Sequence, residues 1–115
     1  MTIREMYDAL GSDFDALLGR LMKEELVERL VKKYTADTNM ELLEKSLGQK
    51  DYEEAFRAVH TLKGLAMNLG FDKLAASASE LTEDLRFEKY GRIDELFGKV
   101  KADQEEVLSY IARLN

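Results

Sequence analysis

The sequence predicts an all-α fold: an up-and-down antiparallel four-helix bundle with additional short N-terminal helices. Three observations lead to this prediction. The 115 residues include no proline, the residue that most readily breaks a helix. Apolar residues recur at the three- and four-residue spacing of a helix almost throughout, and no segment alternates as a strand would. The segments between the periodic stretches are short, which favours antiparallel neighbours.

Helical spacing delimits a series of stretches along the chain. They cover residues 3–10, 14–21, 26–34, 38–47, 51–69, 71–85 and 93–114. Capping boxes, in which Thr is followed three residues later by Glu, are predicted at Thr2–Glu5 and Thr38–Glu41. Ser12 and Asp51 are expected to cap the second and fifth stretches. Glycines are expected to end three of the stretches, at Gly11, Gly48 and Gly70, and Gly91 is expected to break the chain before the last stretch.

A single domain is expected, because 115 residues and 13.2 kDa are close to the usual size of one domain. We expect residues 21–114 to form the bundle and residues 1–20 to form an N-terminal helical addition. Both ends of the chain lie at predicted helix ends, which favours a free-standing protein, and we expect a monomer. The predicted core contains Leu30, Val59, Leu62, Ala66, Leu69, Leu81, Leu85, Leu96, Val100, Val107 and Ile111.

The composition excludes several classes of function. The chain has 17 Lys and Arg against 23 Asp and Glu, whereas nucleic-acid binding needs an excess of positive charge on one face. It has no cysteine, so disulfides and thiolate sites are impossible. No apolar run approaches the roughly 18 residues of a membrane span, and the N-terminus lacks a signal peptide's apolar core. We therefore expect a cytoplasmic protein that binds neither nucleic acid nor membrane.

The single histidine, His60, lies on the most informative predicted helix. On a wheel with about 100° per residue, the apolar residues of this helix form one broad stripe that includes Val59. His60 lies about 100° from Val59, at the edge of the stripe. At that position the ring can rest against the next helix while one nitrogen faces solvent. A lone histidine on a helix is more often an ordinary surface residue, so its neighbours decide the interpretation.

Two residues after His60 strengthen a functional interpretation. Lys63 lies three positions on, where helical side chains share a face, and its cation would help to hold a negative group attached to the imidazole. Gly64 lies four positions on, in mid-helix, where glycine costs roughly 0.5–1 kcal/mol relative to alanine. Its bare backbone leaves room for another macromolecule, with Phe56 and Met67 as an apolar border. Tight helix packing is the alternative explanation of such a glycine.

The segment from Ala55 to Gly70, followed by Leu74, carries a recognisable pattern. It contains H-x-L-K-G, then a small residue, then Leu-Gly. This pattern closely resembles the histidine-containing phosphotransfer (Hpt) domain, and the predicted helices from about Leu21 to Leu114 are consistent with its four-helix bundle. The resemblance implies a phosphorelay intermediate. In that family the histidine accepts a phosphoryl group from an aspartyl phosphate on a response-regulator receiver domain, or from a sensor histidine kinase, and passes it on.

Under this resemblance, His60 is the phosphoacceptor, Lys63 neutralises phosphoryl charge and Gly64 gives clearance to the receiver domain. The receiver would dock on Phe56, Met67, Arg57 and Glu53. The Mg²⁺ and the phosphoaspartate would come with the receiver domain, so the chain is expected to need no cofactor and no metal site. It is expected to be a phosphocarrier rather than an enzyme, because it has no P-loop or G-x-G-x-x-G pattern for nucleotide binding.

One departure from the family concerns the helix that follows. Related domains often place polar or acidic partners of the imidazole nineteen and twenty-two residues after the histidine, and in the chemotaxis-kinase branch the second is a glutamate. Here these positions are Ser79 and Thr82. Either hydroxyl could hydrogen-bond to the ring, but Thr82 cannot raise imidazole basicity as a carboxylate would. This departure favours a shuttle that is supplied by receiver domains.

Three other classes of protein were weighed. A histidine-kinase dimerisation domain usually has an acidic residue directly after its histidine and a proline soon after, whereas Thr61 follows here and proline is absent. A di-iron bundle needs Glu-x-x-His on two helices, and this chain has one histidine. The alternative that stays open is an Hpt-like adaptor bundle that binds receiver or kinase domains without being phosphorylated.

Overall fold

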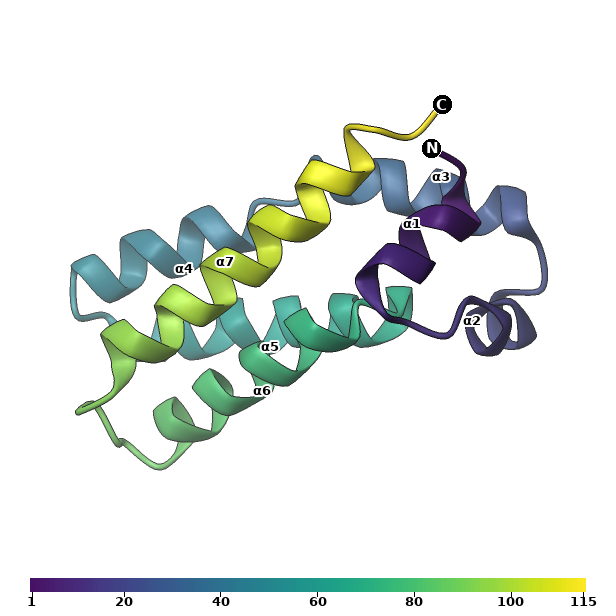
Figure 1. Ribbon diagram of the computed structural model, residues 1–115. Helices are drawn as coiled ribbons and strands as arrows, with labels where there is room; N and C mark the ends of the chain where they lie inside the picture. Colours follow the sequence, from purple (N-terminus) through teal and green to yellow (C-terminus); the bar gives the residue numbers. More distant parts are fainter.

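Seven α-helices and no strand make up the regular structure, which confirms the predicted all-α class (Figure 1). The computed structural model describes residues 1–115. The helices are α1 (Ile3–Leu10), α2 (Phe14–Leu21), α3 (Glu24–Tyr34), α4 (Asn39–Gly48), α5 (Tyr52–Leu69), α6 (Asp72–Arg86) and α7 (Ile93–Ile111). None of the seven combines the length and the apolar character that a membrane span needs.

The bundle is formed by α3 to α7. The most extensive contacts join α4 to α5, α5 to α6 and α6 to α7, so consecutive antiparallel helices pack side by side. Two polar contacts join α7 to α3 and α4. The Tyr34 hydroxyl on α3 donates to Gln104 Oε1 at 2.5 Å, and the Lys101 ammonium lies 3.1 Å from Glu44 Oε1 on α4. These contacts bring the last helix back to α3 and α4 and close the bundle.

One continuous hydrophobic core includes residues from all seven helices. Of the core residues predicted from the sequence, all are buried except Leu30, which is partly exposed. The prediction for Leu30 was wrong because α3 makes few contacts with α5. Leu30 therefore lines an open groove between these two helices instead of being covered by them.

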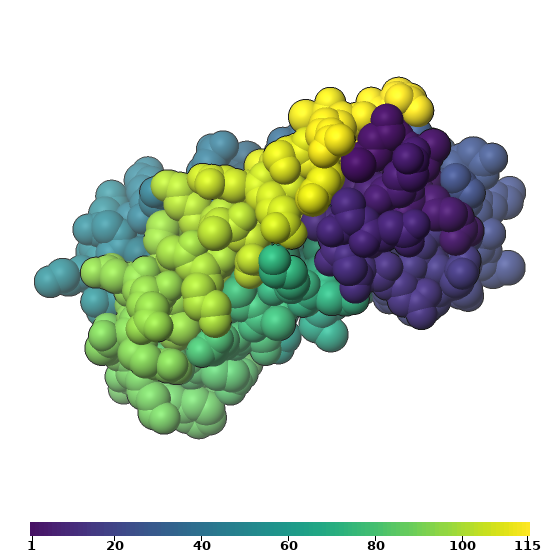
Figure 2. Space-filling model, in the orientation of Figure 1, coloured from purple at the N-terminus to yellow at the C-terminus, as the bar shows by residue number.

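The two N-terminal helices cover one end of the bundle. The Tyr7 hydroxyl on α1 donates to the backbone oxygen of Leu69 at 2.5 Å, and the Tyr7 ring lies 6.0 Å from that of Phe71. Figure 2 shows this N-terminal segment packed beside the C-terminal residues. There the N-terminal ammonium of Met1 donates to Asn115 Oδ1 at 3.0 Å. The addition is thus part of the same packed unit.

The helix caps agree with the sequence in part. The Thr2–Glu5 capping box is formed. Ser12 does not cap α2: it lies in the turn that follows α1, where its backbone N–H donates to Tyr7 O, and it is not the residue that directly precedes α2. Asp13 is the capping residue instead, accepting from the N–H of Ala16. Ser12 is buried, and its hydroxyl has no hydrogen-bond partner.

The Thr38–Glu41 box is not formed. Thr38 precedes α4, but its side chain makes no cap hydrogen bond, and Asp37 accepts from the N–H of Asn39 instead. α4 ends at Gly48 and Gly91 lies in the turn before α7, as predicted. The positive φ angles after α4 and α6 belong to Lys50 and Glu88, so neither glycine takes the left-handed conformation. The last helix ends at Ile111, and the residues up to Leu114 form a turn.

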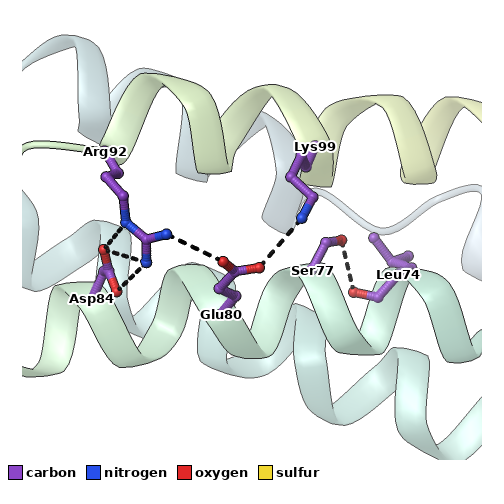
Figure 3. Close-up of polar contacts among 6 residues, drawn as sticks. All are labelled: Leu74, Ser77, Glu80, Asp84, Arg92 and Lys99. Atoms are coloured by element: carbon purple, nitrogen blue, oxygen red, sulfur yellow. Dashed lines mark hydrogen bonds and ion pairs between the residues drawn. The ribbon is translucent and has the colours of Figure 1, made fainter.

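A row of charged side chains joins α6 to α7 (Figure 3). The guanidinium of Arg92 donates to both carboxylate oxygens of Asp84, at 3.2–3.3 Å, and lies 3.5 Å from Glu80. Lys99 reaches the other oxygen of Glu80 at 3.4 Å. The hydrogen bond to the largely buried Asp84 raises the pKa of Arg92 above its ordinary value. These contacts fix the start of α7 against α6.

Candidate functional site

The site is built on α5, the helix that carries the histidine. The carboxylate of Asp51 caps its start and accepts from the N–H of Glu54 at 3.2 Å, as the sequence predicts. Gly70 ends it with φ of 72°. The face turned to the core consists of Ala55, Ala58, Val59, Leu62, Ala66 and Leu69, all buried. The register of these residues fixes which side chains point outward.

His60 lies near the middle of α5 and is exposed, although Val59 and Leu62 beside it are fully buried. Its ring lies parallel to that of Phe56, with 5.7 Å between centroids and 5° between planes. No group of the chain hydrogen-bonds to the imidazole. Its nitrogens are therefore free to react with a group that approaches from solvent.

Lys63 and Gly64 lie one turn after His60, and both are partly exposed. Lys63 forms no ion pair within the chain. A Cβ atom built on Gly64 would meet no other atom within 4 Å, so it would point into open space. Tight packing between helices therefore does not explain this glycine, and the backbone here is open to a partner.

The remaining predicted docking residues also lie on α5. Arg57 pairs with Glu54 at 2.6 Å and with Glu53 at 3.4 Å. The hydrogen bond to Glu54 raises the pKa of Arg57 above its ordinary value. Met67 is 54% exposed, which is unusual for a large apolar side chain. The exposed rim around His60 thus combines paired charges with apolar surface.

An open groove of about 440 Å³ lies between α5 and α6, and Phe56, whose ring stacks on His60, is one of the residues that line it. Glu53 and Phe56 line it from α5, and Arg86 lines it from α6. The guanidinium carbon of Arg86 lies 5.1 Å from the centroid of the Phe56 ring. At the far end the rings of Tyr52 and Tyr90 stack at 4.0 Å. Two of the predicted docking residues, Glu53 and Phe56, therefore line one groove between α5 and α6.

The sequence analysis missed Arg86, although the register of the two helices could have found it. The family pattern places Thr82 opposite His60. In antiparallel helices, a step of four residues back on α5 corresponds to a step of four forward on α6. The same register therefore places Arg86 opposite Phe56, which is the contact that the structure shows.

The sequence analysis also missed Arg20 of α2. Its guanidinium donates to the backbone oxygens of Met67 and Asn68 at 3.3 and 3.4 Å. These carbonyls lie in the last turn of α5, where a cation is favourable, and the Met67 oxygen also accepts from the N–H of Gly70. No sequence signal indicated this contact. It places the N-terminal addition beside the end of the helix that carries His60.

The predicted hydrogen bond between Thr82 and the imidazole is not formed. Thr82 is fully buried, and its hydroxyl donates to the backbone oxygen of Ala78 at 2.7 Å. Threonine in a helix readily makes this bond to the residue four positions earlier. Ser79 is partly exposed and makes no hydrogen bond to the ring either. Neither hydroxyl orients His60 in this structure.

Comparisons with known proteins give one positive result. A family model, described as the Hpt domain, matches residues 24–112. The match begins at the first residue of α3 and ends one residue after α7, so it spans the bundle and the helix that carries His60. The searches of curated proteins and of solved structures found no match.

Proposed function

The chain belongs to the Hpt domain family, and from that membership we propose that it is a phosphocarrier of a two-component phosphorelay, with His60 as the phosphoacceptor. Hpt domains are histidine phosphotransfer modules. The finer proposal is that this chain exchanges a phosphoryl group between His60 and the aspartate of response-regulator receiver domains, without autokinase activity. The observation that carries it is the exposed imidazole of His60, free of hydrogen bonds, beside an open helix backbone.

The chemistry requires a neutral imidazole. One ring nitrogen carries a lone pair, which forms a bond to the phosphorus of the aspartyl phosphate. The P–O bond to the aspartate carboxyl breaks, and its electron pair returns to the carboxylate. The imidazole then carries a positive charge, which it loses when the second nitrogen releases its proton to water. Such a nitrogen is a competent nucleophile near neutral pH.

Lys63 is proposed to stabilise the transferred group. Phosphoryl transfer passes through a loose, highly charged transition state, so catalysis depends on positioning and on charge neutralisation. The ammonium of Lys63 lies one helical turn from His60 and is not neutralised by a carboxylate of the chain. Any Mg²⁺ that assists the transfer is expected on the receiver domain.

The receiver domain is proposed to dock over the outer face of α5. Gly64 would let its phosphorylated loop approach, since a Cβ atom there would project into the contact. Met67 supplies exposed apolar area, and the 440 Å³ groove between α5 and α6 gives space to a side chain of the partner. Glu53 and Arg57 lie at the rim, where charges govern the choice of partner and the rate of association more than affinity.

The test uses receiver domains charged with labelled phosphate. Each is mixed with the wild-type protein or with the His60→Gln variant. We expect label on the wild type in an acid-labile, base-stable linkage and none on the variant. Because His60 is exposed and makes no hydrogen bond, His60→Gln should leave the thermal midpoint almost unchanged, so loss of label cannot be attributed to unfolding.

Two other outcomes would lead to different conclusions. Label on both proteins would show that another residue is the acceptor. If no receiver transfers label, a binding assay with the same receivers separates the remaining cases. Binding without transfer would identify an adaptor bundle. Absence of both binding and transfer from a broad set of receivers would refute the proposed function.

A further inference from the structure

The imidazole of His60 has one directional contact in the chain, the parallel stack on Phe56. The two residues are four apart on α5, where helical side chains face each other. Their rings are 5.7 Å apart with 5° between planes. This is the offset, parallel arrangement that attracts aromatic rings, within the usual range of about 4.5–7 Å. The contact restricts both the rotamer and the plane of the imidazole.

Phe56 is itself held in place, whereas His60 is exposed. The Phe56 ring is partly buried and packs against the core. The Arg86 guanidinium carbon lies 5.1 Å from its centroid, close enough for a cation–π contact. Arg86 also has a partner on its own helix, because its Nε donates to Glu83 at 3.2 Å. A chain of contacts thus extends from α6 through Phe56 to the imidazole.

From this arrangement we infer that Phe56, supported by Arg86, is the positioning residue that orients the His60 imidazole for phosphoryl transfer. The inference rests on the proposed function of His60. Related domains use a polar partner on the following helix, but here the hydroxyl of Thr82 donates to Ala78 O instead. Stacking supplies the orientation that a hydrogen bond would otherwise give. Orientation matters because small misalignments of reacting atoms slow such reactions strongly.

The size of the effect follows from the rotamers of histidine. Without the stack, an exposed imidazole samples about three χ1 wells and two χ2 orientations, or about six states, of which one is productive. One χ1 well is disfavoured in a helix, so about four states remain. We therefore expect Phe56→Leu to lower the maximal rate of transfer from a bound receiver about four- to sixfold.

Three measurements separate positioning from docking. The first is the transfer rate as a function of receiver concentration, with a receiver found by the assay above. Phe56→Leu should lower the maximal rate and leave the half-saturating concentration unchanged, and Phe56→Tyr, which keeps the ring, should restore the rate. Thr82→Val should change neither quantity, because its hydroxyl does not reach the imidazole.

The second measurement uses phosphoramidate, a small donor that needs no docking. An imidazole nitrogen bonds to its phosphorus, the P–N bond breaks, and ammonia leaves with the electron pair. Because this donor approaches from any direction, Phe56→Leu should react at the wild-type rate. If the wild type gains no phosphoryl group on His60 from either donor, the proposed function fails. If the wild type reacts and only the Phe56 prediction fails, the positioning role alone is refuted.

The third measurement needs no partner. The face of the Phe56 ring should shift the NMR signals of the His60 ring protons upfield, and Phe56→Leu should abolish this shift. If Phe56→Leu does not fold, Arg86→Gln removes the cation that contacts the Phe56 ring and leaves that ring in place. We expect this variant to lower the maximal rate by less than Phe56→Leu would. Arg113→Gln is its control, since it removes a similar contact to Tyr110 elsewhere. A raised half-saturating concentration with an unchanged maximal rate would overturn the inference and make Phe56 a docking residue.

Discussion

Gly64 is the position where stability and function are expected to change in opposite directions. It lies in the interior of α5, where glycine costs roughly 0.5–1 kcal/mol relative to alanine because its backbone is freer in the unfolded chain. The added Cβ would meet no other atom within 4 Å, so no clash offsets this gain. We therefore expect Gly64→Ala to raise the free energy of unfolding by about 0.5–1 kcal/mol. For a chain of this size the thermal midpoint should rise by about 2–4 °C.

Gly98 provides a matched control. It also lies inside a long helix, α7, and a Cβ atom there would likewise meet nothing within 4 Å. Gly98→Ala should thus stabilise the fold by a similar amount. The assay is urea unfolding of both variants, monitored by circular dichroism and fitted with a common dependence of the unfolding free energy on urea concentration. A destabilised Gly64→Ala protein would show that the backbone at this position is not open.

Transfer from a charged receiver should distinguish the two glycines. Gly64→Gln places a longer side chain where the receiver is proposed to approach, and a displacement of the phosphoryl group by about 1 Å can cost as much as 100-fold in rate. We expect Gly64→Gln to slow transfer at least about tenfold and Gly98→Gln to leave it unchanged. If Gly64→Gln transfers at the wild-type rate, the clearance argument is refuted. If both variants are slow, the effect does not belong to this site.

Three further predictions follow from the same structure. Lys63→Ala should slow transfer without abolishing it, because a cation one turn from His60 is removed while the nucleophile remains. Lys45→Ala, an exposed change on α4, is its control, and equal transfer rates for the two variants would refute the proposed role of Lys63. Asp51→Ala should cost about 1 kcal/mol of unfolding free energy through loss of the cap on Glu54, measured by urea unfolding, and should leave phosphoramidate labelling intact. Burial raises the pKa of Tyr7 above its ordinary value, so the unfolded chain loses the phenolic proton at a lower pH than the folded chain, and the free energy of unfolding should fall as pH rises above about 10. Tyr7→Phe should make that fall shallower by up to about 1.4 kcal/mol per pH unit. An equal pH dependence of unfolding in the two proteins would contradict this.

The positions of the helices could be predicted because they depend on local spacing, whereas several helix ends could not. Apolar periodicity identified every helix within a few residues. Capping depends on the path of the chain before the helix. Ser12 has a suitable side chain for a cap, but it lies in the turn that follows Gly11, and Asp13, the next residue, directly precedes α2 and caps it. The residue types alone do not show which of two adjacent candidates lies directly before the first residue of the helix.

The same distinction applies to the site. The exposure of His60 follows from its angle on the helix, which the sequence determines once the apolar stripe is known. The orientation of its ring does not follow, because it depends on which neighbouring groups are already engaged. The family pattern points to Thr82 as a partner of the ring, whereas its hydroxyl donates to the backbone oxygen of Ala78 on α6. Only the structure shows that the ring contact comes from the same helix.

The absence of a carboxylate partner has a consequence for the chemistry. A carboxylate that accepts a proton from the imidazole fixes the tautomer and raises the basicity of the other nitrogen. A stacked phenyl ring fixes the plane of the imidazole but has no comparable hydrogen bond to either nitrogen. The stack therefore orients His60 and leaves both of its nitrogens without a hydrogen-bond partner. Such an acceptor suits a donor that is already activated, as an aspartyl phosphate is, which is the role that the proposed function assigns to the receiver domain.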